Sequence, residues 1–186
     1  TGKGEAVMLG IVPDKQEVFV GEQIILSVFL LSRVELSDIQ SLTQPTLEGL
    51  LLERDDRPRN NLTPRVQRFE GVDYQVFEVA RFALFPLREG ALSIGEFGLD
   101  AQGAFSFFSQ PRTYHVTSLP VKVSAKALPA NGKPAGFTSF NVGRFSFTAQ
   151  LSAATTEVGK PVTLRLVASG YGNIPKLDLP KPQLSD

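Results

Sequence analysis

The sequence lacks cysteine and tryptophan altogether, and His115 is its single histidine. Without cysteine the chain has no disulfide bonds, no thiolate metal ligands and no thiol nucleophile. One histidine cannot build a multi-histidine metal site alone, and a serine–histidine–aspartate arrangement would have to use His115. Residues 112–117 around it have the pattern of a strand rather than of the exposed turn that holds such a nucleophile. We therefore expect His115 to face solvent from a strand, and the chain to be no enzyme and to need no cofactor.

The chain also lacks an excess of charge of either sign, since 19 Lys and Arg residues are balanced by 19 Asp and Glu residues. Proteins that bind nucleic acid or anionic membrane surfaces normally carry a basic excess, so both partner classes are disfavoured. No run approaches the roughly 18 apolar residues of a membrane-spanning helix, and no signal-peptide pattern opens the chain. Hydrophobic residues make up 42% of the chain and charged residues 20%, which is the composition of an ordinary folded domain.

What the sequence does contain is a series of short stretches rich in Val, Ile, Leu and Phe, separated by Gly, Pro, Asn and Asp. This pattern predicts strands and no helix. The expected strands are Ala6–Val12, Gln23–Leu31, Tyr74–Leu84, Ala91–Leu99, Thr113–Lys126, Phe145–Leu151 and Pro161–Ala168. Many short strands, with 14 Phe to fill the space between sheets, favour an all-β fold of tandem immunoglobulin-like antiparallel β-sandwiches.

An internal repeat indicates two such units. Residues 20–26 and 158–164 read Val-Gly-Glu-Gln-Ile-Ile-Leu and Val-Gly-Lys-Pro-Val-Thr-Leu, so each copy places Val-Gly and two turn residues before a strand. Gly21 and Gly159 are expected to supply a turn conformation that β-branched residues resist. The similarity between the two copies continues downstream in two further matching pairs, Ile39 with Ile174 and Pro45 with Pro180. We therefore expect a strand, a crossover and a second strand in each copy.

The stretch between the copies predicts a domain boundary. Residues 128–136 concentrate proline, glycine and small residues, as linkers between compact units do. We therefore expect a complete first domain over residues 1–127 and the N-terminal part of a second domain over residues 137–186. Half a sandwich leaves one apolar sheet face uncovered, so we also expect that the parent chain continues past Asp186, or that the first domain or another copy covers this face.

Several motifs in both halves occur in the order and spacing of one known family. In the second half they are Asn-Val-Gly-Arg-Phe at residues 141–145, the Val-Gly-Lys-Pro repeat segment, and Ser-Gly-Tyr-Gly-Asn-Ile at residues 169–174. In the first half they are Val-Phe-Val-Gly-Glu-Gln-Ile at residues 18–24, Phe-Pro-Leu-Arg-Glu-Gly-Ala-Leu-Ser-Ile at residues 85–94, and Ser-Leu-Pro-Val-Lys-Val at residues 118–123. With these motifs the chain resembles the BatD family, also called the oxygen-tolerance family.

This resemblance implies a periplasmic or otherwise extracytoplasmic protein of the bacterial envelope, whose full-length parent is anchored in the inner membrane by a segment outside this chain. It also implies von Willebrand A-type proteins as partners, in the neighbourhood of a MoxR-type ATPase. The family offers no established catalytic residues. On this basis we expect a non-enzymatic scaffold or adaptor of an envelope complex linked to oxygen or stress tolerance.

The most polar stretch, residues 53–68, is expected to form a long loop and to contact a partner, with a merely solvated loop as the alternative. Arginine is favoured at interfaces because its planar guanidinium pairs with carboxylates through two hydrogen bonds. The candidate partner-binding residues here are Arg54, Asp55, Asp56, Arg57, Arg59, Arg65 and Arg68. If a von Willebrand A-type partner presents a metal ion, Asp55 or Asp56 is the first candidate to complete its coordination.

Two further routes to a partner come from apolar residues and sheet edges. Phe105, Phe107 and Phe108 fill the core or a domain junction, or else form an exposed anchor for another protein. An uncovered sheet edge in the incomplete second unit offers backbone groups to a partner strand. We expect the main interface to combine the polar loop with the concavity where the linker near Pro129 brings the two units together.

Small groups of acidic residues keep a second function class open, a calcium- or carbohydrate-dependent adhesion module of the cell surface. Asp55 with Asp56, Glu70 with Asp73, and Glu96 with Asp100 offer oxygen atoms of the kind that calcium binds. No EF-hand spacing occurs, and solvated loop charge explains the same residues. Sugar binding normally uses aromatic stacking, for which the chain has no Trp and three Tyr.

Overall fold

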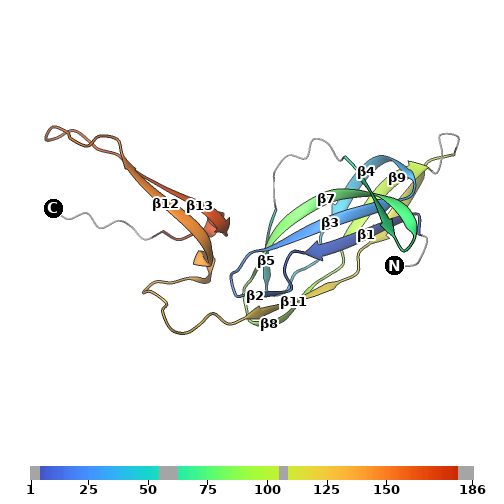
Figure 1. Ribbon diagram of the computed structural model, residues 1–186, viewed down its shortest axis with the longest axis horizontal. Helices are drawn as coiled ribbons and strands as arrows, with labels where there is room; N and C mark the ends of the chain where they lie inside the picture. The colour runs from blue at the N-terminus through green and yellow to red at the C-terminus, as the bar shows by residue number, and fades with distance from the viewer. Residues whose placement is uncertain (1–4, 55–62, 105–108, 180–186) are drawn as a thin grey trace.

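The computed structural model describes residues 5–54, 63–104 and 109–179, and it confirms an all-β fold (Figure 1). The strands are β1 (Val7–Pro13), β2 (Glu17–Phe19), β3 (Ile24–Ser32), β4 (Glu35–Thr43), β5 (Leu50–Arg54), β6 (Arg65–Phe69), β7 (Val72–Pro86), β8 (Gly90–Ile94), β9 (Gly98–Ala104), β10 (Arg112–Thr117), β11 (Val121–Lys126), β12 (Gly143–Leu151) and β13 (Leu164–Gly172). Two short 3-10 helices, η1 (Ser139–Asn141) and η2 (Ile174–Lys176), flank the last strand pair.

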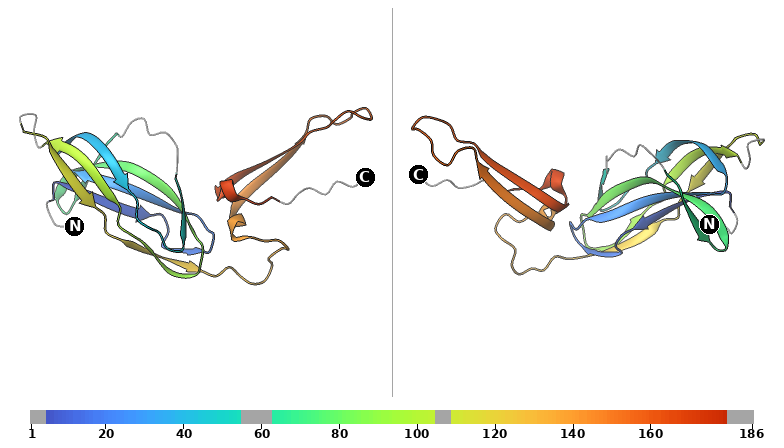
Figure 2. Two further views of the ribbon diagram at one scale, coloured as in Figure 1. Left: turned by 180° about the vertical axis from the view of Figure 1, so that it is seen from behind. Right: turned by 45° about the horizontal axis from the view of Figure 1, so that its top comes forward.

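Strands β1 to β11 form a β-sandwich of two layers, called the sandwich below (Figure 2). One layer has the strand order β1-β3-β7-β5, with β6 paired to the other half of β7. The second layer consists of the sheets β10-β9-β4 and β2-β11-β8. Among the described strands, β2 and β11 pair in parallel and the other pairs are antiparallel.

The core lies between these two layers. Strand β3 alternates buried and half-buried residues along its whole length, with Ile24, Leu26, Val28 and Leu30 fully buried. This alternation follows from the period of two that places successive side chains on opposite sheet faces. Phe82 of β7 and Phe97 between β8 and β9 join the layers, with ring centroids 5.5 Å apart. The apolar alternation in the sequence therefore builds the core as expected.

Two of the expected strands are wrong as single strands. Ala91–Leu99 is divided into β8 and β9, and Thr113–Lys126 is divided into β10 and β11. The two interruptions lie side by side, because the Phe97 amide donates to Ser118 Oγ (3.0 Å) and the Ser118 amide donates to the Phe97 carbonyl (2.9 Å). Pro120 has no N–H to continue a ladder at this point. The second layer therefore turns from one sheet to the other at a common corner.

The predicted long loop over residues 53–68 is wrong at both of its ends. Strand β5 continues to Arg54 and β6 begins at Arg65, while residues 55–62 lie outside the described residues. Both strands form on β7, which is 15 residues long and pairs with β6 along its first part and with β5 along its last. The hairpin from β6 to β7 turns at Glu70 and Gly71, with φ of 49° and 84°. Positive φ at both positions is typical of the tight type I′ turn.

Strands β12 and β13 form a separate two-stranded sheet, called the ribbon below. Residues 127–138 lead to it without regular secondary structure. Gly21 and Gly159 of the repeat have φ of 80° and 90°, so both adopt the expected left-handed turn conformation. The expected second strand of each copy is wrong for the second copy. Ile39 lies in β4, but Ile174 begins the helix η2, where Pro175 favours a helical start over a strand. Pro180 lies outside the described residues.

Candidate functional site

The two faces of the ribbon differ sharply in chemistry. The antiparallel register pairs Phe145 with Gly170, Phe147 with Ala168, Ala149 with Leu166, and Leu151 with Leu164, and these residues share one face. The alternating positions on the opposite face are Arg144, Ser146, Thr148, Gln150, Arg165, Val167, Ser169 and Tyr171. One face is therefore entirely apolar and the other carries the polar and charged groups.

The apolar face of the ribbon is open to solvent. Phe147 exposes 60% of its surface and Leu151 exposes 62%, whereas every second apolar side chain of β3 is fully buried in the sandwich. Phe145 is half-buried near the junction end, where its ring packs against Phe147 with the centroids 6.3 Å apart. The uncovered apolar sheet face that was expected in the second unit is therefore present in the described ribbon.

The ribbon is joined to the sandwich by direct contacts at one end. The Gly172 amide donates a hydrogen bond to Gln23 Oε1 (3.0 Å), and Lys176 Nζ lies 3.5 Å from Glu53 Oε1. Gly21 lies so close to Ser139 that a Cβ on Gly21 would overlap the Ser139 carbonyl oxygen. The repeat glycine of the first copy therefore has a second role besides its turn, because it admits the backbone of η1.

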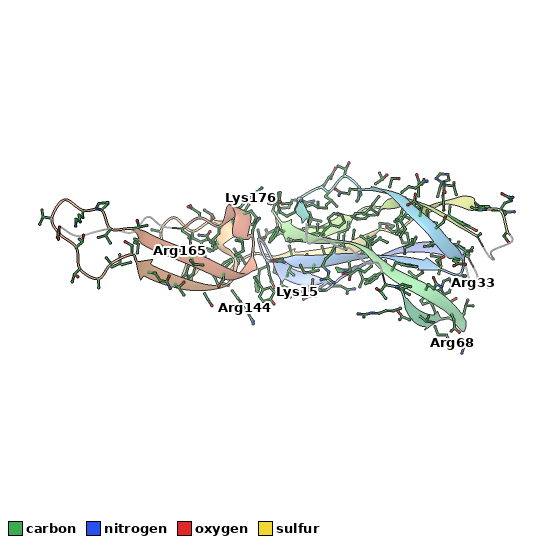
Figure 3. All side chains as sticks on the ribbon, turned by 90° about the horizontal axis from the view of Figure 1, so that it is seen from above. Lys15, Arg33, Arg68, Arg144, Arg165 and Lys176 are labelled. Atoms are coloured by element: carbon green, nitrogen blue, oxygen red, sulfur yellow. The ribbon has the colours of Figure 1, made fainter. Side chains whose placement is uncertain are left out.

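A cleft of about 620 Å³ lies at this junction. The β1–β2 turn contributes Asp14 and Lys15, the β2–β3 region contributes Phe19 and Glu22, and the ribbon contributes Arg144 and Tyr171. Figure 3 shows Lys15 and Arg144 near each other at this place. The expected concavity between the two units is thus present, but these turns and strands line it rather than the linker residues near Pro129.

Glu22 organises the charges on the sandwich side of the cleft. Its carboxylate accepts hydrogen bonds from Lys15 Nζ (2.7 Å) and from the Phe19 amide (3.0 Å). Partial burial raises the pKa of Glu22, but these two hydrogen bonds and the positive charges of Lys15 and Arg144 outweigh it and lower the pKa below its usual value. Lys15 and Glu22 thus neutralise each other, and Arg144 is the positive group on the ribbon side.

The predicted partner-binding residues fall into two groups. Asp55, Asp56, Arg57 and Arg59, together with Phe105, Phe107 and Phe108, lie outside the described residues. Arg54 is the last residue of β5, and Arg65 and Arg68 lie on β6, all of whose residues are exposed. Arg68 donates to the Gly71 carbonyl (3.2 Å from Nε and from Nη2) and lies 3.6 Å from Asp73 Oδ1. Arg68 therefore stabilises its own hairpin, and Arg65 is open to a partner.

His115 lies on β10 and is exposed, which confirms the expected strand histidine. Its Nδ1 is 2.7 Å from Asp100 Oδ1, and this hydrogen bond lowers the pKa of Asp100 below its usual value. Neither residue lines the cleft. Within residues 5–54, 63–104 and 109–179, no three His, Asp or Glu side chains gather in a way that could hold a metal ion.

Comparison with known proteins found no match to the chain among family models, curated proteins or solved structures. Neither helix of the described segments has the length and apolar character needed to cross a membrane.

Proposed function

We propose that this chain is a non-enzymatic adaptor that joins protein partners, and that the apolar face of the ribbon is its main docking surface. The observation that carries this proposal is the exposure of Phe147 and Leu151 on a face that contains no polar residue. Contiguous exposed apolar side chains are typical of protein interfaces. A two-stranded sheet is only marginally stable in water, so a covering partner stabilises the ribbon as well.

A second exposed surface supports an adaptor rather than a single-partner module. On the β6–β7 hairpin, Phe69 exposes 49% of its surface on the face that also carries the exposed Arg65, and Val66 exposes 75% on the opposite face. Figure 3 shows Arg68 of this hairpin at the end of the molecule opposite to Arg165 of the ribbon. Surfaces at opposite ends allow one chain to contact two proteins at the same time.

The resemblance to the BatD family supplies the identity of the partners in this proposal. It supports an immunoglobulin-like type for the sandwich, an extracytoplasmic location in a bacterial envelope, and a parent chain anchored in the inner membrane. The partners are then von Willebrand A-type proteins, in a complex linked to oxygen or stress tolerance.

The test is affinity capture of native envelope proteins on the immobilised chain, followed by mass spectrometry. The parent chain is compared with the double variant Phe147→Ser/Leu151→Ser and with the control Thr148→Ala/Gln150→Ala on the opposite face. We expect von Willebrand A-type proteins to bind the parent and the control, and to be lost with the double variant. Equal capture by all three chains rules out the apolar face, and capture of no such protein by the parent rules out the partner class.

The hairpin surface is tested in the same capture with Arg65→Ala/Val66→Ser. If the chain has two docking surfaces, the hairpin variant is expected to lose a different subset of the bound proteins than the ribbon variant loses. If both variants lose the same proteins, the chain has one interface and the adaptor arrangement is wrong.

A further inference from the structure

The ribbon has two edges that are open to hydrogen bonding. In the described sheets β12 pairs only with β13, and β13 only with β12, over nine residues each. Each strand therefore presents an outer row of N–H and C=O groups without a ladder partner. Such an edge accepts an additional strand, and the main-chain hydrogen bonds supply affinity.

The polar face of the ribbon is cationic along its length. Arg144 lies opposite Tyr171 at the junction end, and Arg165 lies opposite Gln150 towards the other end. Neither strand contains an aspartate or a glutamate. Glu22 is close enough to act on Arg144, but Lys15 already pairs with it at 2.7 Å. The two arginines therefore leave the polar face with a net positive charge.

We propose that the ribbon binds an extended partner segment by strand addition, and that this segment alternates apolar residues with acidic ones. An added strand continues the pleat, so its side chains fall in turn on the two faces of the ribbon. Apolar side chains then extend the face of Phe147, and carboxylates lie on the face of Arg144 and Arg165. This inference rests on the proposed adaptor function and specifies the chemistry of its partner.

A second copy of the chain fits this site less well. A nine-residue strand pair is about 30 Å long and about 10 Å wide, so two ribbons packed face to face bury about 600 Å² in total, without main-chain hydrogen bonds between them. Stable interfaces of this kind bury about 1,200 Å² or more. Pairing two ribbons edge to edge with matching faces brings the arginines of both copies to one sheet face, where like charges are destabilising. An acidic partner strand gains the main-chain hydrogen bonds of an edge and places opposite charges, rather than like charges, beside the arginines.

The charge preference is tested with two labelled nine-residue peptides, one of alternating Val and Glu and one of alternating Val and Lys, by fluorescence anisotropy on the full chain. Because attraction is replaced by repulsion at two exposed positions, we expect the acidic peptide to bind about tenfold more tightly. The variant Arg144→Glu/Arg165→Glu is expected to reverse this order. The control Arg112→Glu, an exposed arginine on β10, is expected to leave it unchanged. Equal binding of the two peptides by the parent chain overturns the acidic pattern.

Strand addition is tested with the acidic peptide methylated at every backbone nitrogen, and with a control peptide methylated at alternate nitrogens. An added strand needs one row of N–H groups facing the ribbon, and the control keeps such a row for one of the two edges, so the control is expected to bind and the fully methylated peptide is not. Binding of the fully methylated peptide rules out strand addition.

The outcomes separate this inference from the proposed function. If no peptide binds while envelope capture still depends on Phe147 and Leu151, strand addition is wrong and the adaptor stands. If the acidic peptide binds as described but envelope capture does not depend on these residues, the inference holds and the adaptor proposal is wrong.

Discussion

Glu22 connects three segments of the chain through a single carboxylate. It accepts hydrogen bonds from Lys15 Nζ and from the Phe19 amide, and it lies within electrostatic reach of Arg144 on the ribbon. Its pKa is lowered in the folded state, so these interactions stabilise the fold above the unfolded value of 4.5. This stabilisation is lost as the pH falls through the lower, folded pKa, where the carboxylate takes up a proton.

The variant Lys15→Met is expected to raise the pKa of Glu22 and to lower the free energy of unfolding near neutral pH. Because the pair is partly exposed, the loss is below about 1 kcal/mol. The measurement is urea unfolding near neutral pH and again in acid below the pKa of Glu22, where parent and variant are expected to converge. The control Lys160→Met removes the more exposed ion pair with Glu157 in the connection between β12 and β13, and its effect is expected to be smaller. A loss of the same size at both pH values contradicts the role given to Glu22.

Individual strands differ in how they are stabilised. Strand β3 buries every second residue in the core, whereas β6 is exposed at all five positions and is held by its pairing with β7. Strand β4 is similar to β6, since it is largely polar and exposed and pairs with β9 through two register shifts. The apolar period of two therefore predicted β3 correctly and missed β4 and β6, whose formation depends on neighbouring strands far along the chain.

This difference between strands predicts unequal effects of shortening their side chains. Leu26→Ala on β3 removes a fully buried side chain and is expected to cost about 2–5 kcal/mol of unfolding free energy. Val66→Ala on β6 changes an exposed residue, and its effect is expected to stay within about 0.5 kcal/mol. Urea unfolding of the two variants measures both values. A comparable loss for Val66→Ala is incompatible with an unpacked β6.

The molecule as a whole depends on the joint between the sandwich and the ribbon. At this joint Gly21 combines a φ of 80° with a close approach to Ser139 of η1, and Gln23 accepts the hydrogen bond from Gly172. Gly71 has a similar φ of 84°, but a Cβ there would meet no atom within 4 Å. These two glycines therefore form a matched pair that separates backbone strain from the contact with the ribbon.

Gly21→Ala is expected to displace η1 and to break the hydrogen bond between Gly172 and Gln23. Gly71→Ala is expected to cost only the backbone strain of a left-handed alanine, about 1–2 kcal/mol, and to leave the joint closed. Hydrogen exchange at the Gly172 amide measures the difference, since an amide without its acceptor exchanges faster. If the exchange rate of the Gly172 amide is the same in Gly21→Ala as in the parent, the close contact between Gly21 and Ser139 is not needed to hold the ribbon against the sandwich.

The all-β class, the left-handed turns at Gly21 and Gly159, and the strand position of His115 were predictable from the sequence alone. These features depend on residues that are neighbours along the chain, because apolar period and turn chemistry are local properties. The tertiary contacts were needed to show that Phe97 and Ser118 form a common corner, that β6 pairs with β7, and that the β1–β2 turn and β12 line the cleft. Each of these features depends on contacts between segments that are distant along the chain, as in the hydrogen bond between Gln23 and Gly172, which are 149 positions apart. Local sequence patterns do not specify which distant segments come into contact.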